Sequence, residues 1–158
     1  MLSLKSHKPL AWYCLVLLLF IEGILALMGG FKLIKDPTGS LIGMPTTLLS
    51  HSPFSNFLIP GIVLFCLLGV FPLVVIYLLL FKPQGKFFSF LNLHSDRHYS
   101  WSFSLYVGLL IILWIFFEVW WVGYTHPLQI IFSFLGMLII MLALMPSVKN
   151  HYLHKNNL

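Results

Sequence analysis

Two acidic residues in apolar surroundings are the first candidates for chemistry in this sequence. Glu22 interrupts the run LAWYCLVLLLFIEGILALMG, and Glu118 lies within WIFFEVWW. A carboxylate in the middle of a bilayer costs at least ~2.5 kcal/mol, and such residues usually face the interior of a helix bundle. The two acids therefore predict either a binding site for a ligand or proton, or residues that only lock helix packing, protonated or hydrogen-bonded to Trp, Tyr or Ser.

Further polar residues are expected at the same end of the helices as these acids. They are Lys32, Lys35, Asp36, His51 and His126, and with Glu22 and Glu118 they make up the candidate ligand- and proton-site residues. Their placement favours an outward-opening polar pocket, with the two carboxyls as floor and wall, covered by the loop that follows the first helix. We assign no catalytic residue.

The other reactive side chains do not form a recognisable site. His94 and His98 stand four residues apart, a spacing that can bind metal on a helix, but no third ligand is near and the flanks are typical of a loop. Cys14 and Cys66 lie in separate apolar runs without a CxxC pair, so we interpret both as small apolar core residues. The sequence predicts no metal and no cofactor, and it lacks Walker A, GxGxxG, GxSxG and HExxH motifs.

The elements that must position these residues are predicted to be transmembrane helices. Hydrophobic residues make up 59% of the chain and charged residues only 8%, whereas soluble domains carry about 25% charged residues. The length suits a single domain over residues 1–158. Four segments are about long enough to cross a bilayer, at about 10–29, 57–81, 101–122 and 127–145. Because backbone groups in lipid must bond within their own segment, we expect an all-α, four-transmembrane-helix bundle.

The distribution of basic residues predicts how the bundle is oriented. Lys and Arg flank the apolar segments and form no single patch, which favours the lipid bilayer over nucleic acid as a partner. Seven of them fall on the side of the N-terminus, second loop and tail, and two fall on the side of the first and third loops. The positive-inside rule then places both termini in the cytoplasm, in a multi-pass protein of the inner (plasma) membrane.

The connections between the helices differ in character. The third loop is only about 123–126, so the last two helices are predicted to be antiparallel neighbours. The first loop, about 30–56, contains the turn signal Asp36-Pro37-Thr38-Gly39 and a short helix at about 44–51. Its apolar residues predict that it lies against the bundle mouth or the membrane interface. Residues 87–91 in the second loop are predicted to lie on the cytoplasmic leaflet. Pro72 is expected to disturb the second helix.

Two stretches resemble small bacterial four-helix membrane proteins that have no assigned activity. KDPTGSLIGMP and SPFSNFLIPG are similar to the first outer loop of that group, and WIFFEVWWVGYTHPLQIIFSFLG is similar to its third and fourth helices. The resemblance implies a shared design that includes Asp36, Gly39, Gly43, Pro45, Pro60, Gly61, Glu118 and Gln129. Glu22 also resembles, in residue type, the membrane Glu in the first helix of small multidrug transporters, although those proteins are far shorter and lack the long first loop.

Three kinds of function are compatible with these features. The first is a non-enzymatic accessory, sensor or small-molecule binding protein with an outward-facing polar pocket, whose outer loop contacts a membrane protein partner or a second copy in a homodimer. The second is a proton-coupled small-molecule transporter that uses Glu22 and Glu118. The third is an enzyme acting on a lipid or quinone at the outer leaflet, with these acids and His51 or His126 in proton transfer.

Overall fold

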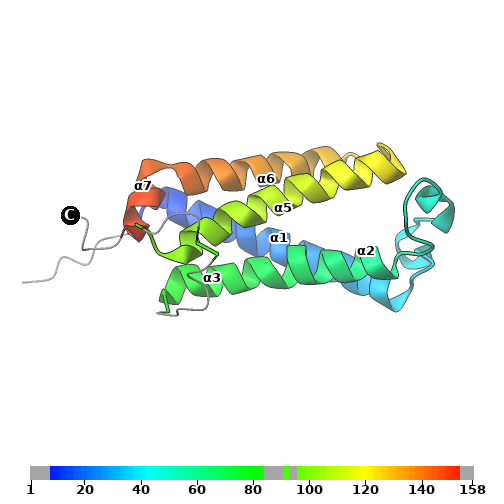
Figure 1. The fold of residues 1–158 in the computed structure, drawn as a ribbon, viewed down its shortest axis with the longest axis horizontal. Helices are drawn as coiled ribbons and strands as arrows, with labels where there is room; N and C mark the ends of the chain where they lie inside the picture. The colour runs from blue at the N-terminus through cyan, green and yellow to red at the C-terminus, as the bar shows by residue number, and fades with distance from the viewer. Residues whose placement is uncertain (1–7, 84–90, 93–95, 154–158) are drawn as a thin grey trace, which may run out of the picture.

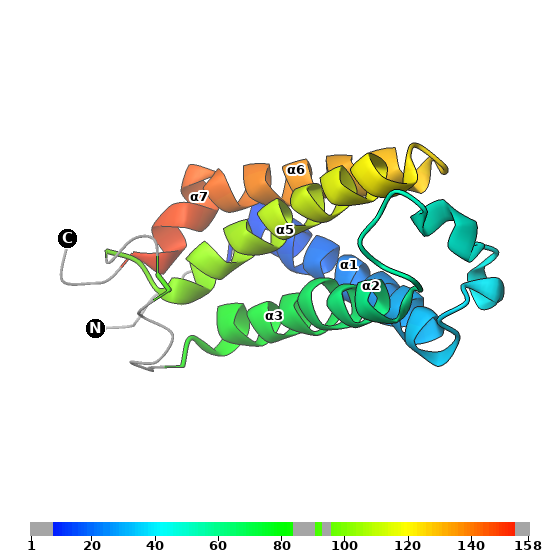
Figure 2. The same ribbon diagram turned by 45° about the vertical axis from the view of Figure 1, so that its right-hand side comes forward.

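The computed structural model describes residues 8–83, 91–92 and 96–153, and over these residues the protein is helical, with a single isolated β-bridge between Arg97 and Leu153. The long elements are α1 (Leu10–Lys35), the continuous stretch of α2 (Leu58–Val63), η3 (Leu64–Val70) and α3 (Phe71–Phe81), then α5 (Tyr99–Val122) and α6 (Leu128–Leu144). They run side by side along the long axis of the molecule (Figures 1 and 2).

Three helices are long and apolar enough to cross a membrane: Leu10–Lys35, Leu58–Phe81 and Tyr99–Val122. The pair Leu128–Leu144 and Pro146–Tyr152 passes the same test together, with a bend of 59° between its parts. The prediction of an all-helical chain with several apolar spans is therefore confirmed, at three to four candidate spans. Large apolar side chains cover the outside of these helices, as contact with lipid requires.

The first helix is longer than its sequence indicates. Gly29-Gly30 was predicted to end it, but α1 continues to Lys35. The extra turns are held by packing, because a methyl group at Gly30 would lie 2.6 Å from the backbone nitrogen of Phe65, and Leu33 is buried in a cluster with Leu49 and Phe57. A helix stabilised by a close neighbour tolerates glycines that would otherwise weaken it.

The second span is regular except just before Pro72. Residues Leu64–Val70 form a π-helix, in which the N–H of Phe71 bonds to the carbonyl of Cys66. Proline has no N–H and its ring presses on the carbonyl one turn earlier, so the wider π-turn relieves the clash. The expected disturbance at Pro72 is therefore present as a change of helix type within one span of 24 residues.

Glycines bring the helices into backbone contact in two pairs. A methyl group at Gly69 of the π-helix would lie 3.0 Å from the nitrogen of Leu27 in α1. In the α5–α6 hairpin, a methyl group at Gly108 would lie 2.8 Å from the carbonyl oxygen of Gly136, and one at Gly136 would lie 2.9 Å from that of Gly108. Close approach of this kind is the usual way in which helices associate in lipid.

Residues 36–57 cover one end of the bundle. Their short 3₁₀ helices, η1 (Ser40–Ile42) and η2 (Thr46–Leu49), fall close to the expected short helix at 44–51. Leu49 is buried with Leu33 and Phe57, and Phe54 packs edge-on against Trp121 of α5 at 5.4 Å. This segment, which we call the cap, therefore packs against the ends of α1 and α5, one of the two positions that its apolar residues predicted.

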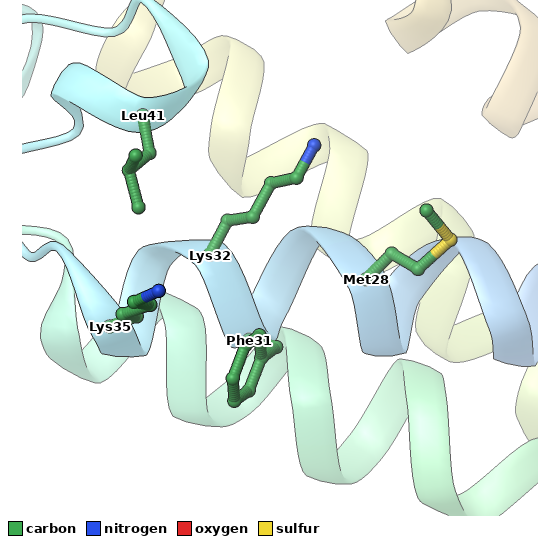
Figure 3. A pocket seen from close by; sticks show the side chains of 5 residues that line it. All are labelled: Met28, Phe31, Lys32, Lys35 and Leu41. Atoms are coloured by element: carbon green, nitrogen blue, oxygen red, sulfur yellow. The ribbon is translucent and has the colours of Figure 1, made fainter.

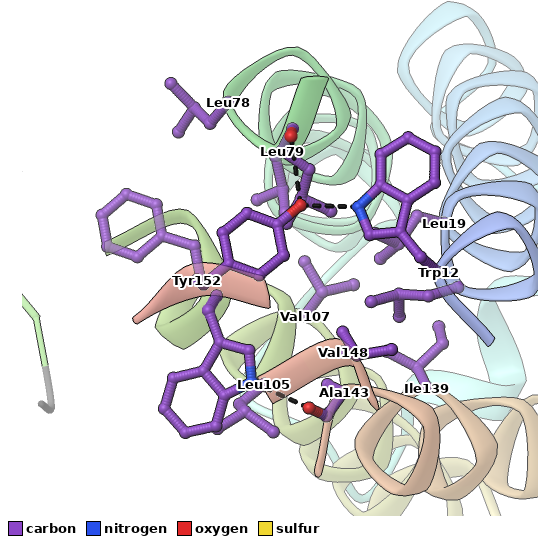
Figure 4. Close-up of a cluster of buried hydrophobic side chains, with 14 of the residues drawn as sticks. Trp12, Leu19, Leu78, Leu79, Leu105, Val107, Ile139, Ala143, Val148 and Tyr152 are labelled. Atoms are coloured by element: carbon purple, nitrogen blue, oxygen red, sulfur yellow. Dashed lines mark hydrogen bonds between the residues drawn. The ribbon is translucent and has the colours of Figure 1, made fainter. Parts of the chain in front are cut away.

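The opposite end is closed by the C-terminal part of the described chain, formed by α7 (Pro146–Lys149) and η4 (Asn150–Tyr152). Tyr152 is 1% exposed; its hydroxyl accepts a hydrogen bond from Trp12 Nε1 at 2.6 Å and donates to the carbonyl of Leu79 at 3.1 Å (Figure 4). The Lys82 amine binds the carbonyl of His151 at 2.9 Å and lies over the Tyr152 ring. We call residues 146–153 the plug, which links α1, α3 and α6.

We expect Tyr152→Phe to lower the free energy of unfolding by about 1–3 kcal/mol, because the buried Trp12 Nε1–H then has no acceptor. Thermal unfolding of the detergent-solubilised full chain measures this. Tyr124→Phe is the matched control, since Tyr124 is exposed, and it should leave stability unchanged. Equal effects of the two changes would contradict a stabilising role for the plug.

Candidate functional site

Glu22 lies at the midpoint of α1 and is 2% exposed. It belongs to the stripe that α1 buries in the bundle, in which it is preceded by Leu15 and Leu19 and followed by Ala26. This spacing of three and four residues keeps one face of a helix toward its neighbours. The carboxyl is therefore positioned by the same periodicity that builds the apolar core.

The contacts of α1 with the second span show where Glu22 lies along the bundle. A methyl group on the adjacent Gly23 would lie 2.8 Å from Leu73 Cδ2 and 3.2 Å from the carbonyl oxygen of Gly69. Glu22 is thus level with the end of the π-helix and with Pro72, far from both the cap and the plug.

The carboxyl of Glu22 is incompletely bonded. Its Oε2 atom is buried and has no hydrogen-bond partner among the described residues. Leaving such an atom unsatisfied costs about 1–3 kcal/mol, and a buried carboxylate without a partner costs more. Protonation lowers this cost, because a neutral carboxyl is less costly to bury than a carboxylate. A site for a ligand or proton and a protonated packing residue are both compatible with this environment.

Glu118 has a different environment, one turn from the end of α5. Its Oε1 accepts a hydrogen bond from Nε2 of Gln129 in α6 at 2.9 Å, and the Trp114 side chain also bonds to the carboxyl. Gln129 is 3% exposed; it donates to the carbonyl of Gly123 at 3.2 Å and accepts from the N–H of Thr125 at 3.0 Å. This network ties the short α5–α6 connection together, which favours the structural interpretation of Glu118.

The two acids are not joined to each other by a hydrogen bond that the structure shows. Glu22 is about 20 Å from the end of α1 at 1.5 Å per residue, whereas Glu118 is about 6 Å from the end of α5. Their role as floor and wall of one outward-opening pocket stays a prediction. Glu22 has the more unusual environment, because one oxygen of its carboxyl is buried without a hydrogen-bond partner among the described residues.

The other predicted site residues are distributed over the capped end. Lys32 and Lys35 are exposed in the last turns of α1 instead of in a loop. His51 is exposed in the cap with Nδ1 3.1 Å from the Ser50 hydroxyl, and His126 is exposed with Nδ1 accepting from the N–H of Leu128 at 3.2 Å. Neither histidine bonds to either glutamate in the described structure.

Asp36 stabilises the cap at its first residue. Its Oδ1 accepts hydrogen bonds from the hydroxyl and N–H of Thr38 at 2.6 and 3.1 Å, and Oδ2 accepts from the N–H of Leu41 at 3.0 Å. These bonds, first of all that from the Thr38 hydroxyl, hold the pKa of Asp36 below its ordinary value. Gly39, three residues on, has a φ of 80°, which completes the predicted turn.

The residues considered for metal or thiol chemistry do not assemble into a site. In the described part of the chain, no group of three His, Cys, Asp or Glu residues could hold a metal ion. His94 lies outside the described residues, as do 87–90 of the predicted interfacial segment; His98 is the N-cap of α5. Cys14 and Cys66 are exposed on the helix surfaces, so the prediction that they are core residues is wrong.

Two important polar partners were not recognised as such from the sequence. Gln129 was noted only through a resemblance, although Glu118 and Gln129 stand at similar distances on either side of the α5–α6 turn, which places them at one depth. Tyr152 gave no usable signal, because its contacts with Trp12 and Leu79 join residues far apart in the chain.

No known protein family, curated protein or solved structure matches the chain.

The order of the cap is expected to depend on pH through Asp36. Because its pKa is lowered by folding, the stabilisation is complete above the unfolded value of about 3.9 and is lost as pH falls through the lower folded value. Amide hydrogen exchange, corrected for its intrinsic pH dependence, should show faster opening at Thr38 and Leu41 in that acidic range. Asp36→Asn should show the faster opening already at neutral pH. Unchanged protection in this variant would contradict the role of the carboxylate.

We expect Glu118→Leu to destabilise the protein by about 1–3 kcal/mol, because Gln129 then loses an acceptor at a buried site. Glu118→Gln retains an oxygen that can accept the same bond and should lose much less. Thermal unfolding compares the two, with Val119→Leu as the neutral control on the exposed side of α5. Equal losses in the Gln and Leu variants would show that the negative charge, and not the hydrogen bond, matters.

Proposed function

We propose that this chain is a non-enzymatic, multi-pass protein of the inner (plasma) membrane that binds a small molecule at Glu22 and exchanges a proton at the same carboxyl. In this proposal the four segments each cross the bilayer, and both termini lie in the cytoplasm. The plug then faces the cytoplasm and the cap faces outward. The positive-inside distribution of Lys and Arg supports the direction.

The unpartnered oxygen of Glu22 is the observation that carries the proposal. A leucine at this position would complete the apolar stripe of α1 at lower cost, whereas Glu22 places an unbonded polar atom at the centre of a span. Intramembrane acids with this placement are typical of proton and substrate pathways. The matching acid, Glu118, is accounted for by its hydrogen bonds to Gln129 and Trp114.

The surroundings of Glu22 support a site that changes shape. π-Helical turns occur frequently at functional sites, and the one at Leu64–Val70 lies directly against α1 at the level of Glu22. Glu22 is only 2% exposed, and the cap and the plug lie at the two ends of the bundle, so the carboxyl is separated from water. Such separation is what a carrier needs if it binds from one side and releases to the other.

The remaining interpretations have less support. An accessory protein that uses its outer loop for docking would expose the apolar residues of that loop. Leu41 is 54% exposed, but Leu49 and Phe57 are buried against Leu33. An enzyme that works through His51 or His126 would need them close to an acid, and the described contacts of both are local. These functions stay as alternatives to the binding protein.

The experiment tests the ionisation and energetics of Glu22 in the full chain reconstituted in lipid. We expect infrared difference spectra recorded across a pH titration to contain a carboxylic-acid C=O band that Glu22→Gln removes. We also expect Glu22→Leu to raise stability by about 1–3 kcal/mol, because it removes an unsatisfied buried group. If Glu22 instead had only a structural role, Glu22→Leu would lower the stability.

Glu118→Gln is the matched control, since it makes the same substitution at the hydrogen-bonded acid and should leave the Glu22 band in place. Proton uptake into proteoliposomes, followed with an entrapped pH dye, should fall in Glu22→Gln and persist in Glu118→Gln. Destabilisation by both Gln and Leu at position 22, together with wild-type proton uptake, would overturn the proposal.

A further inference from the structure

The outer surface of α1 near the cap carries a shallow groove of about 380 Å³. It is lined by Met28, Phe31, Lys32 and Lys35 of α1 and by Leu41 of the cap (Figure 3). Met28, Phe31 and Leu41 are each more than half exposed. The groove thus combines two amines with an apolar surface on one helix face, and it is separate from the buried Glu22.

The position of the groove along α1 matches the boundary of a bilayer. Lys32 is 22 residues from the start of the helix at Leu10, which is about 33 Å at 1.5 Å per residue. The hydrocarbon core is about 30 Å thick, so the amines of Lys32 and Lys35 reach the level of the lipid headgroups. Met28 and Phe31 lie lower on the helix, at the level of the acyl chains.

The positive charge of the groove is not neutralised within the described chain. Neither Lys32 nor Lys35 forms an ion pair there. The adjacent acid, Asp36, directs both carboxyl oxygens to Thr38 and Leu41 of the cap. Two amines that line one groove at a low-dielectric boundary are both stabilised by an anion bound in that groove.

We infer that this groove binds a membrane lipid with an acidic headgroup, whose phosphate lies between Lys32 and Lys35 and whose acyl chain lies along Met28 and Phe31. Charge complementarity selects an anionic occupant, and the apolar lower half selects one with a hydrocarbon chain. Leu41 extends from the cap over the same groove (Figure 3), so a bound lipid also contacts the cap.

The test is residue-specific amine labelling of the full chain in lipid nanodiscs, both faces of which are open to reagent. The discs contain phosphatidylcholine alone or phosphatidylcholine mixed with phosphatidylglycerol. Labelling at Lys32 and Lys35 is measured by peptide mass spectrometry relative to Lys149, a lysine at the other end of the bundle. Phosphatidylglycerol should slow labelling of the two groove lysines about fivefold more than that of Lys149.

Variants separate a built site from general surface charge. Leu41→Glu puts a carboxylate beside the amines and should abolish the extra protection, whereas Leu41→Gln, a polar change without charge, should retain most of it. Lys32→Gln should reduce the protection of Lys35, because one phosphate contacts both. Thermal unfolding confirms that each variant is folded before labelling.

Three outcomes would overturn the inference. Equal slowing of all lysines by phosphatidylglycerol would indicate diffuse surface charge. Equal protection by soluble glycerol phosphate in phosphatidylcholine discs would indicate a free-anion site without a role for the acyl chain. Protection of the groove in pure phosphatidylcholine that depends on protein concentration would indicate that a second copy of the chain covers it.

Discussion

Helices that are apolar enough to cross a membrane are stabilised by pairing their buried polar groups within the chain, because lipid offers no hydrogen bonds. The partners are found across elements: Trp12 with Tyr152, Trp101 with the carbonyl of Ala143, and Glu118 with Gln129. The first pair joins α1 to the plug, and the other two join α5 to α6. The constraint therefore produces bonds at the helix ends, where they hold the plug and the α5–α6 turn in place.

The middle of the bundle is organised by a different interaction, namely close packing at glycines. Gly69 meets α1 and Gly108 meets Gly136, so that the helix backbones approach closely at these positions. Glu22 lies in this region with an unbonded oxygen, next to a helix segment that proline has already moved out of the α pattern. We propose that a guest molecule or a proton stabilises this incompletely bonded centre.

The two ends differ in what they present. The plug end brings Lys8 over Trp12, Lys82 over Tyr152, and an Arg97–Asp96 ion pair, so its charges are held by rings and acids of the chain. At the cap end, Asp36 bonds within the loop and leaves Lys32 and Lys35 exposed on α1. Charge that is not balanced inside the protein is available to the surroundings, which is the basis of the proposed lipid site.

The amino-acid sequence alone determined the helices, because long apolar runs leave the backbone no other way to satisfy its hydrogen bonds in lipid. The α5–α6 hairpin and the turn at Asp36 followed from local signals of the same kind. The tertiary structure decided where α1 ends, since Gly30 is held by Phe65, and it decided how the acids differ, since Gln129 reaches Glu118 and nothing in the described chain reaches Oε2 of Glu22. Those outcomes depend on which residues meet across helices, and neither periodicity nor composition contains that information.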